Sequence, residues 1–309
     1  MTGGEPLPVA FTVERSYVPW VAAAIRSYLD HHLDDGSQVH VLHQGLDADQ
    51  ERGLDELAPG RIVVHRVDRD AVADLPAVGR FGTVVWLRFL LPALLPEVPR
   101  ILYLDADVLV MGSTHPLWSA DLGGCALAAV PNVVGADMRG HVEALGLAPG
   151  APFLNSGVLL MDLDRWRADG ATARLAGYVR DAEHLVWPDQ DALNVIFDGA
   201  WHRLHPRWNA QNTLWFWPQE AAEVFGAEAL AEATSTPAIV HFEGPSLAKP
   251  WHVLCQHPYR DAWRAALART PWAATPRTGD HVATRLIRLL PSRWRASTYA
   301  RLVRSRAES

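Results

Sequence analysis

Short apolar runs alternate with amphipathic segments along most of this 309-residue chain. Residues 8–13 (PVAFTV) predict a buried strand, and residues 17–32 predict a helix with Val21, Ile25, Tyr28 and Leu29 on one face. Further strand candidates are the segments 39–42, 61–67, 100–110, 125–130, 157–163 and 237–242. Further helix candidates are 47–58, 83–94, 164–182, capped by Asp164, and 189–198 after Pro188. Because each strand candidate is a near-continuous apolar run, this alternation predicts an α/β fold with a mostly parallel sheet covered by helices.

The composition favours a folded protein that does not bind nucleic acid. Hydrophobic residues make up 49% and charged residues 20%, which supplies a large core and excludes global disorder. No run approaches the ~18 apolar residues of a spanning helix, and the N-terminal residues do not resemble a secretory signal. Two cysteines, Cys125 and Cys255, fit a reducing compartment, so we expect a cytoplasmic protein. The net charge of -7 argues against a partner nucleic acid.

Two aspartates close the strongest apolar run, at Asp105-Ala106-Asp107. Residues i and i+2 of an extended chain point to the same side, so both carboxylates can meet one cation. Ligands of open α/β sheets lie beyond the carboxyl ends of the strands. A D-x-D triplet at a strand end also occurs as a simple turn cap, and the triplet alone leaves both interpretations open.

A second apolar strand candidate ends in His241-Phe242-Glu243-Gly244, followed by Lys249. A histidine completes an oxygen-rich site, and a mixed O/N set suits Mn²⁺ better than Ca²⁺. Gly244 lets the backbone approach a phosphate, and the ammonium of Lys249 is a compact partner for phosphate oxygens. Lys249 is the single lysine among 28 basic residues, which favours a functional role over a surface turn.

Polar side chains crowd a predicted helix start at residues 187–194 (WPDQDALN). The helix dipole alone can explain Asp189 or Asp191. It does not explain Gln190 or Asn194, whose amides offer donors and acceptors to sugar hydroxyls. Asn155 adds a further amide just before a buried strand.

Taken in order, these segments resemble the family 8 retaining glycosyltransferases, the group that contains glycogenin and bacterial lipopolysaccharide galactosyl- and glucosyltransferases. The resemblance covers most of residues 8–272. It rests on the start at residues 12–17, WLRF at 86–89, ILYLDADVLV at 101–110, FLNSGVLLMDLDRWR at 153–167, DQDALN at 189–194 and HFEG…KPWH at 241–252.

The resemblance implies a GT-A nucleotide-sugar (Rossmann-like) fold with a mixed central sheet. It implies a UDP-hexose donor, with Mn²⁺, or Mg²⁺ in its place, held by Asp105, Asp107 and His241. The residues that would contact the nucleotide-sugar are Thr12, Glu14, Tyr17, Arg88, Ala106, Asn155, Gly244 and Lys249. Asp189 and Gln190 would be the catalytic residues on the sugar side.

Retention of the anomeric configuration leaves two mechanisms open. Asp189 is the best carboxylate for a covalent intermediate, and Gln190 is the best neutral stabiliser for attack from the leaving-group face. We favour the second, with the departing phosphate helping to deprotonate the acceptor hydroxyl. Glucose and galactose are not distinguished, and the acceptor is a saccharide, a lipid-linked saccharide or a small molecule.

Several positions depart from the family pattern. Glu14 and Ser16 stand where the family usually has Asp and Asn, Asn132 replaces an Asp, Trp86 a Tyr, and Leu154 a Phe. Because of these departures, an alternative hypothesis is that the protein binds a nucleotide-sugar without catalysing transfer. A second rival is a haloacid-dehalogenase-type phosphatase, but no closely spaced acidic pair follows Lys249.

Aromatic and amide residues cluster near position 210, and their flat faces suit sugar stacking. We therefore expect acceptor contacts from Trp208, Asn209, Gln211 and Trp215.

The last 34 residues carry eight arginines and two acidic residues. We divide the chain into a catalytic domain, 1–275, and a basic amphipathic tail, 276–309. Val282, Leu286, Leu289 and Leu290 fall at helical spacing, so residues 282–306 are a candidate contact with the anionic inner membrane face. A solvated or dimer-packing tail is the alternative.

Overall fold

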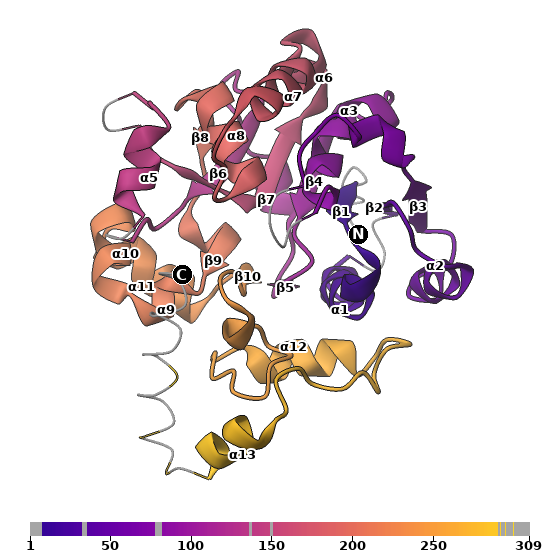
Figure 1. Ribbon diagram of the computed structural model, residues 1–309, viewed down its shortest axis with the longest axis vertical. Helices are drawn as coiled ribbons and strands as arrows, with labels where there is room; N and C mark the ends of the chain where they lie inside the picture. Colours follow the sequence, from indigo (N-terminus) through magenta and orange to yellow (C-terminus); the bar gives the residue numbers. More distant parts are fainter. Residues whose placement is uncertain are drawn as a thin grey trace.

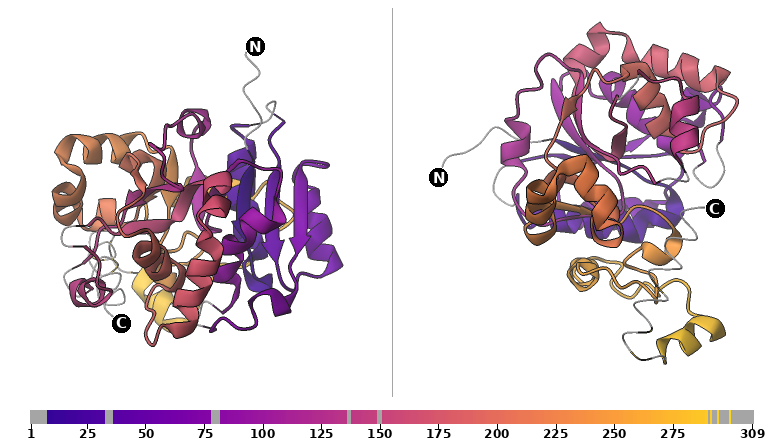
Figure 2. Two further views of the ribbon diagram at one scale, coloured as in Figure 1. Left: turned by 90° about the horizontal axis from the view of Figure 1, so that it is seen from above. Right: turned by 90° about the vertical axis from the view of Figure 1, so that its left-hand side faces the viewer.

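The computed structural model describes residues 8–32, 36–77, 82–135, 138–148 and 151–289, together with 291, 294 and 299. Within these residues the chain forms a layered α/β structure (Figures 1 and 2). One face of the central sheet is covered by α6 (Leu163–Ala168), α7 (Ala171–Asp181) and α8 (Pro188–Phe197), and the other by α1 (Val18–Leu29).

The central sheet has seven strands, and it is mixed as expected. In spatial order they are β3 (Ile62–Arg66), β2 (Val39–His43), β1 (Val9–Thr12), β4 (Arg100–Leu104), β7 (Leu154–Asp162), β6 (Leu127–Pro131) and β8 (His202–Arg203). The first four strands are parallel to one another. β7 runs antiparallel to both β4 and β6, while β6 and β8 are parallel.

Both faces of this sheet are buried, which explains the continuous apolar runs. In β4, Leu102 and Leu104 point into the core beneath α1, whereas Ile101 and Tyr103 point into the core beneath α6–α8. Successive side chains of a strand alternate between the two faces. In a strand that is covered on both faces, nearly every side chain is therefore buried and apolar.

The predicted strand 100–110 is two strands in two different sheets, which corrects the sequence analysis. After β4 the chain turns through residues 105–107 and enters β5 (Val108–Val110). β5 joins a small second sheet in the order β5, β10 (Ile239–His241), β9 (Ala210–Gln211). Apolar runs flank the turn on both sides, so the hydrophobic pattern does not reveal the change of sheet.

Helix α1 (Val18–Leu29) follows a short 3-10 turn, η1 (Arg15–Tyr17), and confirms the predicted first helix. Its predicted apolar face is buried, and so are Ala22, Ala23 and Ala24 on other sides. The reason is that α1 lies between the central sheet and α12 (Arg260–Leu267). Trp20, for example, stacks on Trp251 and packs on Trp263 of α12.

Two predicted helices take a different form. The segment 83–94 is a 3-10 helix, η4 (Val84–Leu90), followed by α3 (Leu91–Leu94), because Pro92 has no N–H to donate to the carbonyl of Arg88. The segment 164–182 is divided into α6 (Leu163–Ala168) and α7 (Ala171–Asp181). Gly170 separates them with a φ of 58°, and the cap of α6 is Asp162 instead of Asp164.

The predicted helix after Pro188 is confirmed as α8 (Pro188–Phe197). The elements not yet given are α2 (Ala48–Asp55), η2 (Arg69–Val72), α4 (His115–Trp118), α5 (Arg139–Ala144), η5 (Pro206–Asn209), α9 (Thr213–Phe216), α10 (Pro218–Phe225), α11 (Ala227–Ser235), η6 (Ser246–Ala248) and α13 (Val282–Arg288).

Contacts cross the predicted boundary after residue 275. The backbone N–H of Thr278 donates to the carbonyl of Trp251 at 3.0 Å, and the N–H of Val253 donates to the carbonyl of Thr278 at 3.0 Å. Tyr299 is buried, with its ring edge-on to Phe216 at 5.5 Å. Most of the predicted basic segment after Leu289 lies outside the described residues, including Leu290 and 300–306. In the described part of the chain, no helix combines the length and the apolar character that a bilayer span requires.

Candidate active site

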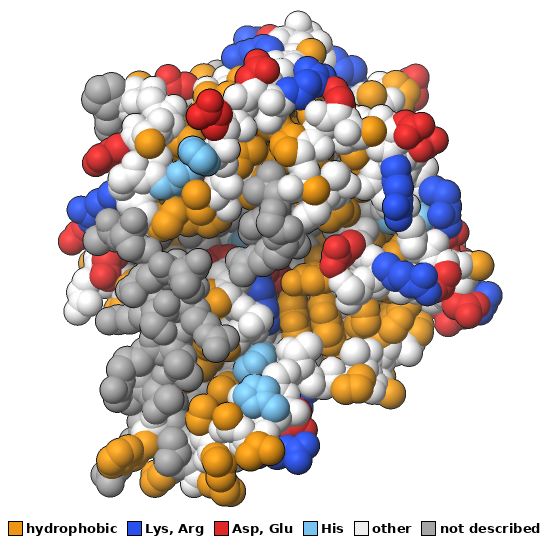
Figure 3. Space-filling view, viewed as in Figure 1, with side chains coloured by type: hydrophobic (Ala, Val, Ile, Leu, Met, Phe, Trp, Pro, Cys, Tyr) orange, Lys and Arg blue, Asp and Glu red, His pale blue; other side chains and the backbone are white. Residues whose placement is uncertain are grey.

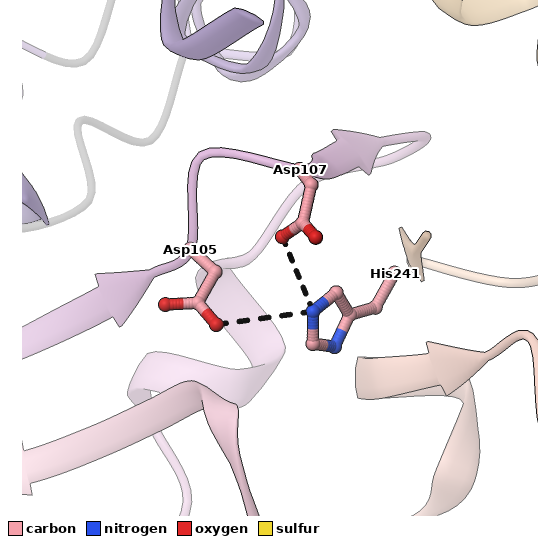
Figure 4. Close-up of side chains that lie close together, drawn as sticks. All are labelled: Asp105, Asp107 and His241. Carbon is pink, nitrogen blue, oxygen red and sulfur yellow. Dashed lines mark ion pairs between the residues drawn. The ribbon is translucent and has the colours of Figure 1, made fainter. Parts of the chain in front are cut away.

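The antiparallel pairing of β10 with β5 brings His241 to the two aspartates. His241 lies opposite Val108, and the N–H of Phe242 donates to the carbonyl of Asp107 at 3.0 Å. Nε2 of His241 is 3.3 Å from Oδ1 of Asp107 and 3.8 Å from Oδ2 of Asp105 (Figure 4). One ligand atom of each of the three residues lies within 4.8 Å of the others, so the predicted triad is assembled.

The charges of the triad are strongly coupled to their surroundings. Burial raises the pKa of Asp105 above its usual range, against the opposing effect of the Arg88 guanidinium. Burial alone would raise the pKa of Asp107 too, but the Lys249 ammonium and the His241 imidazole hold that pKa below its usual range. Burial alone would lower the pKa of His241, but the Asp107 carboxylate outweighs it and raises that pKa. The charge of the two carboxylates is therefore set by burial and by the cationic groups beside them, Arg88 and Lys249.

Lys249 places its ammonium directly at this charge. Its Nζ donates to Oδ2 of Asp107 and, at 2.7 Å, to the carbonyl of Phe242. Gly244, on the turn between His241 and Lys249, has a φ of +87°, where a side chain would be strained. The turn thus places the ammonium of Lys249 beside the triad and leaves the backbone at Gly244 exposed.

Arg88 spans from the triad to α8. It is buried, and its Nη1 donates to the carbonyl of Ser156 at 2.9 Å, while Nη2 donates to Oδ1 of Asp105 at 3.0 Å. The same Nη1 lies 2.8 Å from Oδ2 of Asp189. One guanidinium therefore positions a predicted metal ligand and a predicted catalytic carboxylate together.

Tyr103 is a site residue that the sequence analysis missed. Its hydroxyl donates to Oδ1 of Asp105 at 2.8 Å and accepts from the hydroxyl of Thr12 at 3.0 Å, while its ring lies 4.3 Å beneath the guanidinium of Arg88. Burial raises the pKa of Tyr103, which keeps the phenol a neutral donor. In the sequence this tyrosine resembles the apolar strand residues around it, because no neighbouring residue indicates that its hydroxyl forms hydrogen bonds in the site.

The start of α8 brings Asp189 and Gln190 into the site, and both are buried. Oε1 of Gln190 accepts from the N–H of Ser156 at 3.1 Å. Asp191 holds the preceding loop, because its Oδ2 accepts from the N–H groups of Val186 and Trp187 at 2.9 and 3.0 Å.

Among the residues that the structure describes, the side chain of Asn194, which we expected to face a sugar, bonds only to backbone. It accepts from the N–H of Leu154 at 2.7 Å and donates to the carbonyls of Leu154 and Gln190 at 3.1 and 2.8 Å. Its amide therefore fastens α8 to β7.

Two of the four predicted acceptor residues are fully buried. Nε2 of Gln211 donates to the carbonyl of Pro131 at 2.8 Å, and the amide of Asn209 bonds to Asn155 and His241. In this structure their amides are therefore bonded to protein groups and are not open to an acceptor. Trp208 is partly buried beneath the guanidinium of Arg207, and Trp215 packs edge-on against His257 at 4.5 Å.

Tyr17, Glu14 and Ala106 are three further predicted nucleotide contacts. Tyr17 is 38% exposed and lies edge-on to Trp251 at 6.0 Å, which brings the first helix to the segment that follows Lys249. Glu14 is exposed and accepts a hydrogen bond from the hydroxyl of Ser16. Ala106 is partly buried between the two aspartates.

A cavity of about 370 Å³ opens beside Asn132. The side chain of Asn132 also accepts from Nδ2 of Asn155 at 3.0 Å, so this cavity adjoins the site. Its lining includes Arg139, Glu143, Phe153 and Arg203.

Known proteins resemble the chain in sequence and in fold. Residues 8–255 match the model of the family described as Glycosyl transferase family 8. The chain is 29% identical over 243 residues to General stress protein A of Bacillus subtilis (strain 168), which covers 76% of this chain and 83% of that protein. It is 25% identical over 283 residues to the lipopolysaccharide glucosyltransferase WaaO of Escherichia coli (strain K12), covering 87% and 80%.

A solved structure of the galactosyltransferase LgtC, with donor and acceptor sugar analogues, matches with a TM-score of 0.72 and 24% identity. The match covers 94% of this chain and 99% of that one. The likeness confirms the predicted GT-A fold.

Proposed function

Because the chain belongs to glycosyl transferase family 8, we propose that it is a metal-dependent, retaining hexosyltransferase that uses UDP-glucose or UDP-galactose. The observation that carries this proposal is the convergence of Asp105, Asp107 and His241 beside Lys249. This arrangement collects the charges needed to hold a diphosphate and to stabilise it as a leaving group.

The donor set fits a divalent cation. Two carboxylates and an imidazole supply the mixed oxygen and nitrogen ligands that suit Mn²⁺, with Mg²⁺ as the alternative. Asp105, Asp107 and His241 would hold the ion, and when bound it supplies positive charge against the leaving diphosphate oxygens.

Lys249 and Gly244 serve the same leaving group from the protein side. The ammonium of Lys249 lies in a partly buried position where a charge interaction is stronger than in water. Gly244 would let the backbone approach the phosphates, because no atom of the described residues beyond its chain neighbours lies within 4 Å of a Cβ added there.

On the sugar side we assign Arg88, Asn155, Asp189 and Gln190. Asp189 is paired with Arg88, and a carboxylate held by a guanidinium is a weaker nucleophile than a free one. This pairing favours attack by the acceptor from the leaving-group face, with Gln190 as a neutral stabiliser. A trapped covalent glycosyl adduct on Asp189 would contradict the assignment.

For the acceptor we propose a saccharide, which a lipid or a small molecule can carry. Several relatives are named as lipopolysaccharide glucosyl- or galactosyltransferases, which supports a saccharide. Of the aromatic residues expected to stack on it, Trp208 and Trp215 stay candidates. The cavity beside Asn132 has the size of a small-ligand pocket and adds a second candidate surface.

We also propose contact with an anionic membrane through α13. Val282, Leu286 and Leu289 share one face of this helix and are 73%, 60% and 81% exposed. Arg285 and Arg288 lie beside them. Figure 3 shows hydrophobic side chains gathered at the lower end of the molecule, where Figure 1 draws α13.

A UDP-release screen tests the proposed function. We expect release from UDP-glucose or UDP-galactose only when Mn²⁺ or Mg²⁺ is present, and faster release when a saccharide acceptor is added. Binding of UDP and Mn²⁺ in a thermal-shift assay without release from any UDP-hexose would instead identify a catalytically silent binder. The Asp107→Asn variant is the control for release that does not depend on the site.

A further inference from the structure

A chain of buried amides leads from the backbone of β7 to the imidazole of His241. It consists of the side chains of Asn155 and Asn209, which are 5% and 0% exposed, and it begins at the N–H of Gly157. His241 itself is 3% exposed. Water therefore cannot replace any of these hydrogen-bonded side chains unless the structure opens.

The orientation of Asn155 follows from one unambiguous donor. A backbone N–H can only donate, and that of Gly157 lies 3.0 Å from Oδ1 of Asn155. The oxygen of Asn155 must therefore face Gly157. Its amide nitrogen then faces the other way and donates to Oδ1 of Asn132 at 3.0 Å.

The orientation of Asn209 follows in turn. The oxygen of Asn155 is an acceptor, so the group of Asn209 that lies 2.8 Å from it must be the amide nitrogen, Nδ2. The carbonyl oxygen of Asn209 then faces Nδ1 of His241 at 3.0 Å. An amide oxygen has no proton to give, and consequently Nδ1 of His241 must carry one.

We propose that Asn209 is a positioning residue that fixes His241 as the Nδ1–H tautomer. In a neutral imidazole this leaves the lone pair on Nε2, the nitrogen that faces Asp105 and Asp107. A histidine that binds a metal commonly donates its other ring N–H to an oxygen, which fixes the ring and strengthens the ligand. The metal part of this inference rests on the proposed function, whereas the tautomer does not.

The first test is a measurement on the unaltered, metal-free protein. Nitrogen-15 NMR of labelled histidine distinguishes the two tautomers at a pH where the imidazole is neutral. The chain has 14 histidines, so a His241→Gln variant identifies the resonance. We expect Nδ1–H, and an Nε2–H tautomer at His241 would overturn the proposal without any substitution of Asn209.

The second test compares three variants at matched positions. Asn209→Leu keeps the approximate shape and removes the acceptor, so we expect a mixed tautomer and Mn²⁺ affinity weaker by about 10–100-fold. Asn209→Asp is the conservative variant, because its protonated carboxyl can donate to Asn155 through one oxygen and accept from Nδ1 of His241 through the other, so we expect the Nδ1–H tautomer to be retained. Gln211→Leu removes an equally buried amide that bonds to Pro131, and we expect its tautomer and Mn²⁺ affinity to match the unaltered protein.

The outcomes separate this inference from the proposed function. A folded Asn209→Leu variant that keeps the single tautomer and the Mn²⁺ affinity contradicts the positioning role. If that variant does not fold, loss of the Nδ1–H tautomer in Asn209→Asp contradicts it equally. If the unaltered protein binds no Mn²⁺, the proposed metal dependence fails, while the NMR measurement still decides the tautomer.

Discussion

Nη1 of Arg88 lies 2.8 Å from Oδ2 of Asp189, while Nη2 of the same guanidinium bonds to Asp105. The two carboxylates come from different parts of the chain, Asp105 from the turn after β4 and Asp189 from the first turn of α8. One guanidinium therefore fixes the spacing between a proposed metal ligand and a proposed catalytic carboxylate.

Replacing Arg88 by lysine should lower kcat for UDP release by about 10²–10³-fold, because an ammonium cannot span both carboxylates. Steady-state kinetics with the preferred UDP-hexose measure this change. Arg167→Lys is the matched control, since that guanidinium bonds to the carbonyls of Pro92, Leu95 and Val98 away from the site. Equal losses of kcat in both variants would assign Arg88 to stability alone.

Chelation should abolish transfer, and Mn²⁺ should restore it, because Asp105, Asp107 and His241 are the proposed ligands of the ion. Asp107→Asn should lower kcat by about 10²–10³-fold even at saturating Mn²⁺, because it also removes the partner of Lys249. Transfer measured in EDTA, with and without added Mn²⁺, checks the first point. Full activity in the chelator would refute the metal dependence.

Gly157→Ala should damage the site through a single methyl group. A Cβ at position 157 would lie 2.1 Å from Cε1 of His241, so the imidazole must move. We expect a loss of about 1–3 kcal/mol in the free energy of unfolding and weaker Mn²⁺ binding by calorimetry.

Gly177→Ala in α7 is the control, because no described atom outside the helix's own nearby backbone lies within 4 Å of its added Cβ. There the substitution should raise stability by about 0.5–1 kcal/mol, since alanine favours a helix over glycine. Unchanged Mn²⁺ affinity in Gly157→Ala would show that the ring has room to shift.

Stability should fall in mild acid because of His257. Burial lowers the pKa of His257 from 6.5 to about 3, so between these values the unfolded chain binds a proton that the folded protein excludes. The free energy of unfolding should lose about 1.4 kcal/mol per pH unit from this group as the pH falls below 6.5. Above pH 6.5 both states are neutral and the contribution vanishes.

Urea unfolding between pH 6 and pH 4.5 measures this slope. His257→Gln should reduce it by about 1.4 kcal/mol per pH unit, whereas His184→Gln, at an exposed position, should leave it unchanged. Identical slopes in the unaltered protein and His257→Gln would contradict the assignment.

Membrane contact predicts that Leu286→Ser with Leu289→Ser weakens binding to phosphatidylglycerol vesicles, because both exposed leucines leave the helix face. Vesicle sedimentation measures the bound fraction. Val186→Ser with Val224→Ser removes two other exposed apolar residues and should leave binding unchanged. Deleting residues 277–309 is the broader test, and vesicle binding that survives it ends the proposal.

Most of the fold could be predicted from the sequence because buried parallel strands are apolar on both faces. For that reason β1, β2 and β3 were found within one or two residues of their ends. The same property hid the change from β4 to β5, since Ile101 and Leu109 are equally buried in different sheets. Hydrophobicity reports burial, but it does not report which sheet a strand joins.

The site was predictable where charge stood out against an apolar background. Asp105, Asp107 and His241 each follow or end an apolar run, and the structure brings them together. Asn209 looked equally polar, but it is buried and bonded to His241. A single sequence does not say whether an amide meets a ligand or a neighbouring side chain, because both uses need the same atoms.

The pairing of β10 with β5 also sets when the protein can begin to work during its synthesis. A nascent chain that has emerged only as far as α8 carries both aspartates of the turn at residues 105–107, yet its β5 lacks the neighbour that positions them. The imidazole of His241 and the ammonium of Lys249 follow only with β10 and the turn after it. Under the proposed function, a nascent chain that stops short of Lys249 therefore lacks part of the site that would bind the ion and the donor.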